Sequence, residues 1–259
     1  PTVYAMEGFT LGKPGEPLGA FIAAIVAVKL GKLVAGKTKV DIIVTPFVSI
    51  LSGAVVGFVA GPPISTFMTW LGELVNVNVE LHPVIGGIVV SVLMGIILTL
   101  PISSAAIGVS MSISGLAAGA ATVGCCCNMV GFAVASYREN KVGGLVAQGV
   151  GTSMLQVPNI VKKPVIWLPA IISSAILGPI ASAVLGMTST PVGSGMGSAG
   201  FVGQIAAYGS MVEGGMGSVQ AILLIVLMHF VLPAAISLAV SELMRKKGII
   251  KEGDMKLDV

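Results

Sequence analysis

The chain has 259 residues, of which 55% are hydrophobic and 10% are charged, and its formal net charge is +3. A mean hydropathy of +1.01 and this scarcity of charge exclude an ordinary soluble domain, in which roughly a quarter of the residues are charged. Because the basic residues are scattered between apolar stretches, we expect no nucleic-acid partner. Apolar stretches of about 20 residues recur, which predicts an all-α, polytopic protein embedded in a lipid bilayer.

In chain order, we expect membrane-crossing segments at 17–34, 42–61, 83–100, 101–118, 119–136, 164–185 and 219–243. Residues 1–16 are polar and are expected to form an exposed loop before the first span. The sequence GPP at 61–63 should end the second span, because proline lacks the N–H group that a helix requires. Residues 64–79 are then expected to form an interfacial helix or loop.

The stretch 99–128, TLPISSAAIGVSMSISGLAAGAATVGCCCN, is apolar but has the wrong composition for a lipid-facing helix. Small residues let helices approach closely, and serine hydroxyls hydrogen-bond to neighbouring helices. Pro101 should break the helix, which at membrane depth is tolerated inside protein or beside a water-filled cavity. We therefore expect broken, buried structure near a translocation path. Two ordinary helices packed through small faces would also fit these residues.

Two further segments differ from simple spans. Residues 143–161 carry several amides and hydroxyls, and we expect a re-entrant or surface-lying segment there. The run GSGMGSAGFVG at 193–203 lacks the GK[ST] ending of a phosphate-binding loop. It is expected to be a flexible or re-entrant loop lining a cavity.

The distribution of charged residues favours one arrangement of these segments across the membrane. If 101–136 makes two passes and 143–161 returns to its own side, nearly all basic residues lie on one face. Glu73, Glu80 and Glu213 then lie on the other face. Basic loops favour the cytoplasm, so the C-terminal tail, 244–259, is expected to be cytoplasmic.

Uncharged polar side chains at membrane depth are the main candidates for a binding site. Amides both donate and accept hydrogen bonds, which suits a neutral, polyhydroxylated solute, although amides also hold helices together. His229 lies in the middle of a span, where an ionisable group is a functional candidate; the alternative is a neutral imidazole bonded to a neighbouring helix. Glu213 is either a solvated carboxylate or an acceptor for sugar hydroxyls. The predicted substrate-binding residues are Ser103, Ser104, Asn128, Gln148, Gln156, Asn159, Gln204, Glu213 and His229.

The consecutive residues Cys125, Cys126 and Cys127 do not indicate a metal site. Side chains on a helix fan out by about 100° per residue, so three neighbours cannot hold one ion. We interpret them as small buried hydrophobic residues and predict no metal, cofactor, disulfide or catalytic residue.

Several long stretches resemble one family: KTKVDIIVTPFVSILSGAVVGFVAGPP at 37–63, LTLPISSAAIGVSMSISGLAAGAATVG at 98–124, GTSMLQVPNIVKKPVIWLPAIISSAILGPIA at 151–181 and GSGMGSAGFVGQ at 193–204. With the tail at 241–258, the chain resembles the enzyme IIC-like membrane proteins of the phosphoenolpyruvate-dependent sugar phosphotransferase system, most closely the perfringolysin-regulator branch. The resemblance implies a bacterial plasma-membrane carrier, typically a homodimer, whose sugar is phosphorylated by a cytoplasmic IIB partner rather than by this chain. It also implies a single IIC-like domain over 1–259 from which an N-terminal part is missing.

The leading hypothesis is a permease that moves a sugar-like solute by alternating access, held by broken segments at 99–114, 148–159 and 193–213. One alternative is an ion-coupled carrier without phosphotransfer, with His229 or Glu213 as the coupling group. Another is a membrane-embedded receptor or regulator that signals through the basic tail from Arg245.

Overall fold

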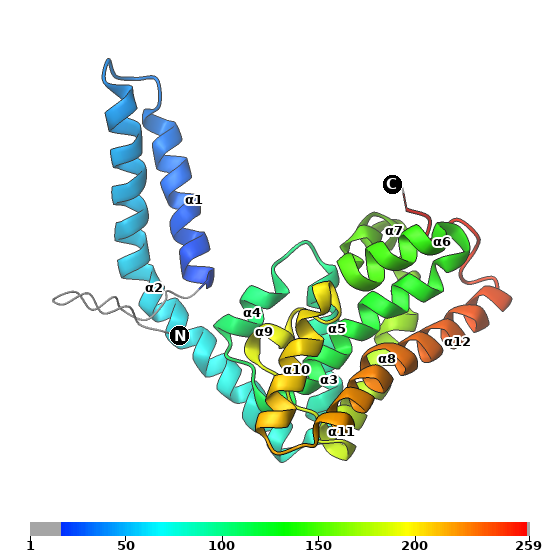
Figure 1. The fold of residues 1–259 in the computed structure, drawn as a ribbon. Coiled ribbons are helices and arrows are strands. Elements are labelled where there is room, and N and C mark those ends of the chain that lie inside the picture. Colours follow the sequence, from blue (N-terminus) through cyan, green and yellow to red (C-terminus); the bar gives the residue numbers. More distant parts are fainter. Residues whose placement is uncertain (1–16, 258–259) are drawn as a thin grey trace. The chain divides into compact units, whose positions relative to one another are not determined.

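The computed structural model describes residues 17–257, which form α-helices interrupted by short 3₁₀ and π turns (Figure 1). The predicted all-α membrane class is confirmed: five of the described helices are long and apolar enough to cross a bilayer. These are Pro17–Val34, Asp41–Leu81, Gly115–Ala135, Pro164–Val184 and Ser218–Lys246. The loop expected at 1–16 lies outside the described residues. Contacts divide the chain into an N-terminal unit, up to Thr69, and a C-terminal unit, from Trp70 onward.

The N-terminal unit is a helical hairpin of α1 (Pro17–Val34) and the first part of α2 (Asp41–Leu81). Its two helices meet through small residues. Gly31 lies against Ser49, and Gly53 lies against Ala27, so the helices run antiparallel. The large side chains point outward instead, as Phe58 does with 84% of its surface exposed. Small residues inside and apolar residues outside are typical of helices that pack within lipid.

The prediction that GPP at 61–63 ends the second span is wrong. Helix α2 continues through Pro62 and Pro63 to Leu81. Each proline removes only one hydrogen bond of the helix, and apolar helix-forming sequence continues on both sides of the pair. The Thr66 hydroxyl also donates to the Pro62 carbonyl at 3.0 Å. Residues 64–79 are therefore part of α2, while their location at the membrane interface stays a prediction.

The C-terminal unit is built around α5 (Gly115–Ala135), which is almost wholly buried. Helix α3 (Pro83–Thr99) packs parallel to α5, because Ser91 meets Gly124 while Thr99, two turns further on, meets Asn128. Helix α8 (Leu168–Pro179) packs antiparallel against both. The three cysteines of α5 are fully buried, as predicted.

The parallel packing of α3 and α5 determines the path between them. The chain must return along the whole length of α3 between Thr99 and Gly115, and it does so through the short helix α4 (Ser104–Ser110) and irregular backbone. Helix α3 is about 26 Å long, since each of its 17 residues adds about 1.5 Å. The 15 residues of 100–114 are enough to cover this length, even with α4 among them. Residues 101–114 therefore run back along α3 before α5 begins, and the helix boundary lies at 115 rather than at the predicted 119. That 101–136 crosses the membrane twice stays a prediction.

The three segments predicted to be broken contain breaks, but the π turns at Ile180–Val184 and Val226–Val231 were not predicted. The remaining elements before the last helix are α6 (Tyr137–Val146), a π turn (Ala147–Gly151), two 3₁₀ turns (Ser153–Gln156 and Pro164–Trp167), α7 (Val157–Lys162), a second π turn (Ile180–Val184), α9 (Pro191–Ser194), a 3₁₀ turn (Ala199–Phe201) and α10 (Val202–Glu213). The third predicted segment, 193–213, is broken only up to Phe201, because 202–213 forms regular helix. Its glycine-rich part packs tightly, with Gly197 against Cys125 and Cys126.

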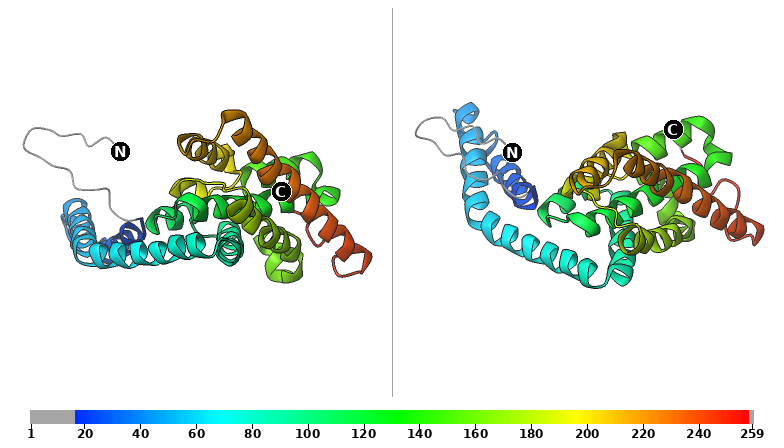
Figure 2. Two further views of the ribbon diagram at one scale, coloured as in Figure 1. Left: turned by 90° about the horizontal axis from the view of Figure 1, so that it is seen from below. Right: turned by 60° about the horizontal axis from the view of Figure 1, so that its bottom comes forward.

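The last span is one continuous helix with a π turn in its middle. It consists of α11 (Ser218–Ile225), the π turn Val226–Val231 and α12 (Leu232–Lys246), and it forms a single rod in every view (Figures 1 and 2). After Lys246 the chain turns back, and Met255 becomes fully buried. The tail therefore packs against the body of the unit.

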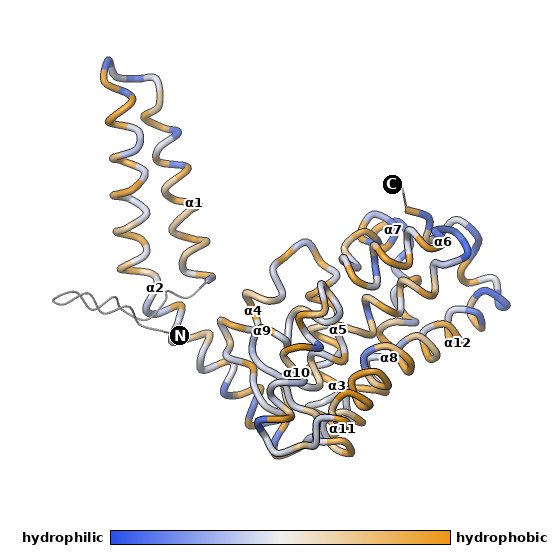
Figure 3. Tube along the Cα trace, viewed as in Figure 1, coloured by the Kyte–Doolittle hydropathy of each residue, from blue (hydrophilic) through white to orange (hydrophobic). Residues whose placement is uncertain are grey.

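The basic residues of this unit lie on α6, at the end of α7, at the end of α12 and in the tail. Hydrophilic residues cluster on α6, on α7 and at the end of α12 (Figure 3). Three ion pairs join these segments: Arg138 with Glu242, Lys163 with Asp254 and Arg245 with Glu139. Their proximity agrees with the charge partition predicted for this part of the chain. The side of the membrane that these segments face stays a prediction.

Candidate functional site

Asn128 is the centre of a buried cluster of uncharged polar groups. It lies in α5 with no exposed surface, and its Oδ1 accepts hydrogen bonds from Trp167 Nε1 at 2.8 Å and from Thr99 Oγ1 at 3.3 Å. Its Nδ2 donates to the Gly124 carbonyl at 3.1 Å and to Ser174 Oγ at 3.4 Å. The cluster thus joins α5 to the end of α3 and to the helical stretch Pro164–Val184, which carries both Trp167 and Ser174.

The same cluster contacts two breaks in the helices. Thr99 is the last residue of α3, and its hydroxyl lies 2.8 Å from that of Ser153, the first residue after the break at Thr152. Backbone freed from a regular helix can bind a ligand or change conformation. The sequence analysis missed Trp167, Thr99, Ser153 and Ser174 as members of the site. Thr99 begins the predicted broken segment 99–114 and Ser153 lies inside the segment 148–159, and that position is the signal that would have found them.

Three predicted amides form a second cluster. Gln156 Nε2 donates to Gln148 Oε1 at 2.8 Å, and Asn159 Nδ2 donates to Gln156 Oε1 at 2.9 Å. Gln148 donates to the Ser136 hydroxyl and the Gly144 carbonyl, whereas the remaining donors of Gln156 and Asn159 bind the tail. Gln156 donates to the Met255 carbonyl at 3.0 Å, and Asn159 donates to the Lys256 carbonyl at 2.9 Å. In this structure, Gln156 and Asn159 therefore hold the C-terminal tail.

Ion pairs reinforce the attachment of the tail. Lys163 Nζ lies 2.5 Å from Asp254 Oδ2, and the backbone N–H of Lys251 donates to the same oxygen at 2.6 Å. Partial burial acts to raise the pKa of Asp254, but the hydrogen bonds and the positive charges of Lys163 and Lys251 outweigh it and hold that pKa below its ordinary value. The folded protein therefore favours the ionised form of Asp254, whose carboxylate attaches the tail to Lys163.

His229 and Gln204 form a third, smaller site. His229 is fully buried in the π turn of the last span, and its Nδ1 lies 3.1 Å from Gln204 Nε2. The amide donates, so the ring is assigned as the neutral tautomer with hydrogen on Nε2. That Nε2 and the Oε1 of Gln204 find no partner among the described residues. Buried polar groups without partners are uncommon and often mark functional positions.

The other predicted residues have local structural roles or lie apart. Ser103 caps α4 by accepting from the backbone N–H of Ala106, and the Ser104 hydroxyl donates to the Gly195 carbonyl at 2.6 Å, joining α4 to α9. Glu213 is exposed at the end of α10. Within residues 17–257, no group of three His, Cys, Asp or Glu side chains is placed to bind a metal ion.

Comparison with known protein families identifies a relationship that covers nearly the whole chain. The chain matches the family described as "Phosphotransferase system, EIIC" over residues 2–257. No curated protein and no solved structure matches it. The match covers nearly the whole chain, and the structure is the bundle of apolar helices that a transport component in the membrane requires. The chain therefore belongs to the EIIC family of the phosphotransferase system.

Proposed function

We propose that the chain is a permease that binds a neutral polar solute, such as a sugar, and carries it across the membrane by alternating access. The carrying observation is the Asn128 cluster, in which an amide, an indole and hydroxyls meet at two helix breaks. Aromatic rings and neutral hydrogen-bonding groups suit a polyhydroxylated molecule. All of these groups are uncharged, so an anionic or cationic solute would find no counter-charge there.

The family supports a partnership with a cytoplasmic IIB protein that phosphorylates the solute, and hence a transport role without catalysis for this chain. We place the charged end of the C-terminal unit in the cytoplasm of a bacterial plasma membrane, because basic residues favour that side. Assembly as a homodimer completes the proposal.

The test is ligand-dependent thermal unfolding of the purified protein with sugars, polyols, sugar acids, phosphate and sodium ions. A solute that binds only the folded state raises the unfolding temperature by mass action. Ser153→Ala and Trp167→Phe each remove one donor, so we expect either to weaken binding of the stabilising sugar or polyol roughly tenfold. Thr122→Val is the matched control, since this buried hydroxyl of α5 bonds only to the Ala118 carbonyl one turn away.

Stabilisation by neutral solutes with the expected losses would support the proposal. Stabilisation only by charged solutes would contradict it, and so would losses of binding in Thr122→Val as large as those in the site variants.

A second candidate, an ion-coupled carrier, is favoured by His229. Its buried Nε2 has no hydrogen-bond partner among residues 17–257. The residue lies in a π turn, a feature that is frequent at functional sites. That function requires uptake by reconstituted protein without IIB, abolished by an uncoupler and by His229→Gln. Uptake that depends on IIB and is insensitive to the uncoupler would exclude it.

A further inference from the structure

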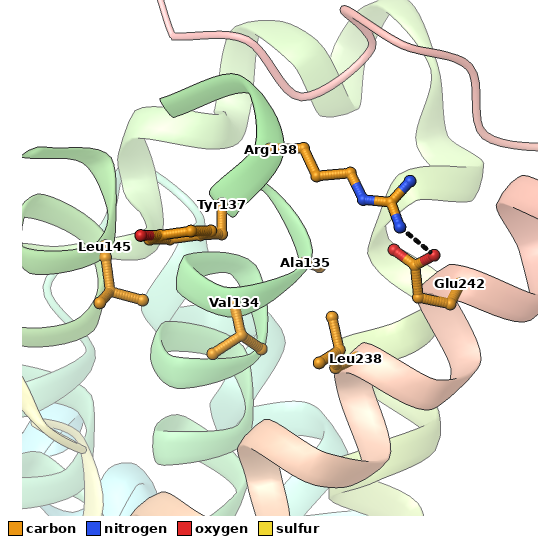
Figure 4. A pocket seen from close by; sticks show the side chains of 7 residues that line it. All are labelled: Val134, Ala135, Tyr137, Arg138, Leu145, Leu238 and Glu242. Carbon is orange, nitrogen blue, oxygen red and sulfur yellow. Dashed lines mark hydrogen bonds and ion pairs between the residues drawn. The ribbon is translucent and has the colours of Figure 1, made fainter. Parts of the chain in front are cut away.

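A hollow of about 430 Å³ opens where α5, α6 and α12 meet (Figure 4). Val134, Leu145 and Leu238 form its apolar lining. Figure 4 shows Tyr137 beside Leu145 on one side and the ion pair of Arg138 and Glu242 on the other. The hollow thus combines an apolar wall with one positive and one negative group.

The ion pair of Arg138 and Glu242 leaves hydrogen-bond donors and acceptors free for a ligand. Arg138 Nη2 donates to Glu242 Oε2 at 2.7 Å, while the two side chains are 66% and 28% exposed. A guanidinium has five N–H donors, and only this one hydrogen bond joins it to another described residue. Glu242 Oε1 has no partner among residues 17–257. A ligand with one anionic and one cationic group can therefore bind both side chains without separating them.

The hollow also lies where two apolar helices end. Helix α5 ends at Ala135, just before Arg138. Val231, the last residue of the π turn, and Ala235 and Leu238 of α12 are exposed at spacings of four and three residues, so they share the face that leads to Glu242. An apolar helix face followed by a charged residue is typical of the level in the membrane where the acyl chains meet the lipid headgroups.

We propose that this hollow binds a phospholipid with a zwitterionic, primary-amine headgroup, phosphoethanolamine. Its phosphate contacts the Arg138 guanidinium, its ammonium donates to the Glu242 carboxylate, and an acyl chain lies along Val231 and Leu238. The neutral headgroup matches a neutral ion pair. A phosphocholine headgroup has no N–H to donate to Glu242, and a phosphoglycerol headgroup brings a net negative charge beside that carboxylate without a compensating cation.

The experiment measures thermal unfolding of delipidated full-length protein in detergent with added dioleoyl phosphatidylethanolamine, phosphatidylcholine or phosphatidylglycerol. We expect stabilisation in that order, with roughly tenfold tighter apparent binding of the ethanolamine lipid than of the choline lipid. Glu242→Gln should abolish this preference, and Arg138→Gln should weaken both zwitterionic lipids. Glu252→Gln changes an exposed carboxylate of the nearby tail, outside the hollow, and is expected to keep the preference.

Photo-crosslinking with an ethanolamine lipid carrying a reactive acyl chain gives a readout that does not depend on stability, and we expect labels on 134–145 and 231–238. Equal binding of the three lipids would overturn the proposal, as would a preference unchanged by Glu242→Gln. Stabilisation that follows protein concentration rather than lipid would also overturn it and would assign the hollow to a second copy of the chain.

Discussion

Replacing Met255 by alanine should destabilise the C-terminal unit by about 2–5 kcal/mol. Met255 has no exposed surface although only four residues of the sequence follow it, and it belongs to a buried cluster with Phe132, Ile166 and Met244. The substitution removes the transfer free energy of a buried side chain, roughly 1.5–3 kcal/mol, and adds the cost of a cavity.

The assay is thermal unfolding of the purified protein in detergent. For a unit of this size, each kcal/mol shifts the midpoint by roughly 2–4 °C, so the expected decrease is roughly 4–20 °C. Ile249→Ala is the matched control, because this side chain of the same tail is 40% exposed and lies outside the buried cluster. Equal shifts for the two variants would refute the reasoning, since they would mean that Met255 is not packed.

Three further predictions use the same measurement. Glu139→Gln should lower the free energy of unfolding by about 3–5 kcal/mol, because it leaves the nearly buried Arg245 without its counter-charge. A decrease below about 1 kcal/mol, which is the range of exposed ion pairs, would contradict this. Gly124→Ala should strongly lower the free energy of unfolding, because the added Cβ would overlap the Ser91 backbone of α3. Gly143→Ala is the control: its Cβ would enter open space, so the free energy of unfolding should not fall. The lowered pKa of Asp254 stabilises the fold above its unfolded pKa of roughly 3.9, and this contribution is lost as pH falls through the folded value. The stability gap between the natural protein and Asp254→Asn should therefore shrink from pH 7 to below 4, and a constant gap would exclude this linkage.

The packed tail changes how the predicted amides can be tested. A double change of Gln156 and Asn159 to alanine would remove the donors that hold the Met255 and Lys256 carbonyls. Loss of uptake in that variant would therefore report a released tail as readily as a lost solute contact. Ser153 and Trp167 are better probes, because neither one donates to the tail.

Local sequence determined the class and most of the helix limits. Spans follow from runs of apolar residues, and the break after Thr99 follows from Pro101, whose effect is confined to neighbouring turns. The same local rule was wrong at Pro62 and Pro63, where it predicted a stop in a continuous helix. Whether a helix ends at a proline or continues through it depends on the sequence that follows and on the surrounding structure. The Pro-Pro dipeptide alone does not determine the outcome.

By itself, the sequence established that uncharged amides and hydroxyls lie among the membrane segments, and tertiary structure decided what they bind. An amide donates equally well to a solute, a side chain or a backbone carbonyl. Gln156 and Met255 are separated by 99 positions, and Asn128 and Trp167 by 39. Only the packing of α3, α5 and α8 and the return of the tail bring these partners within hydrogen-bond distance. Composition therefore determined which polar groups lie within the membrane segments, and long-range packing determined which groups they hydrogen-bond to.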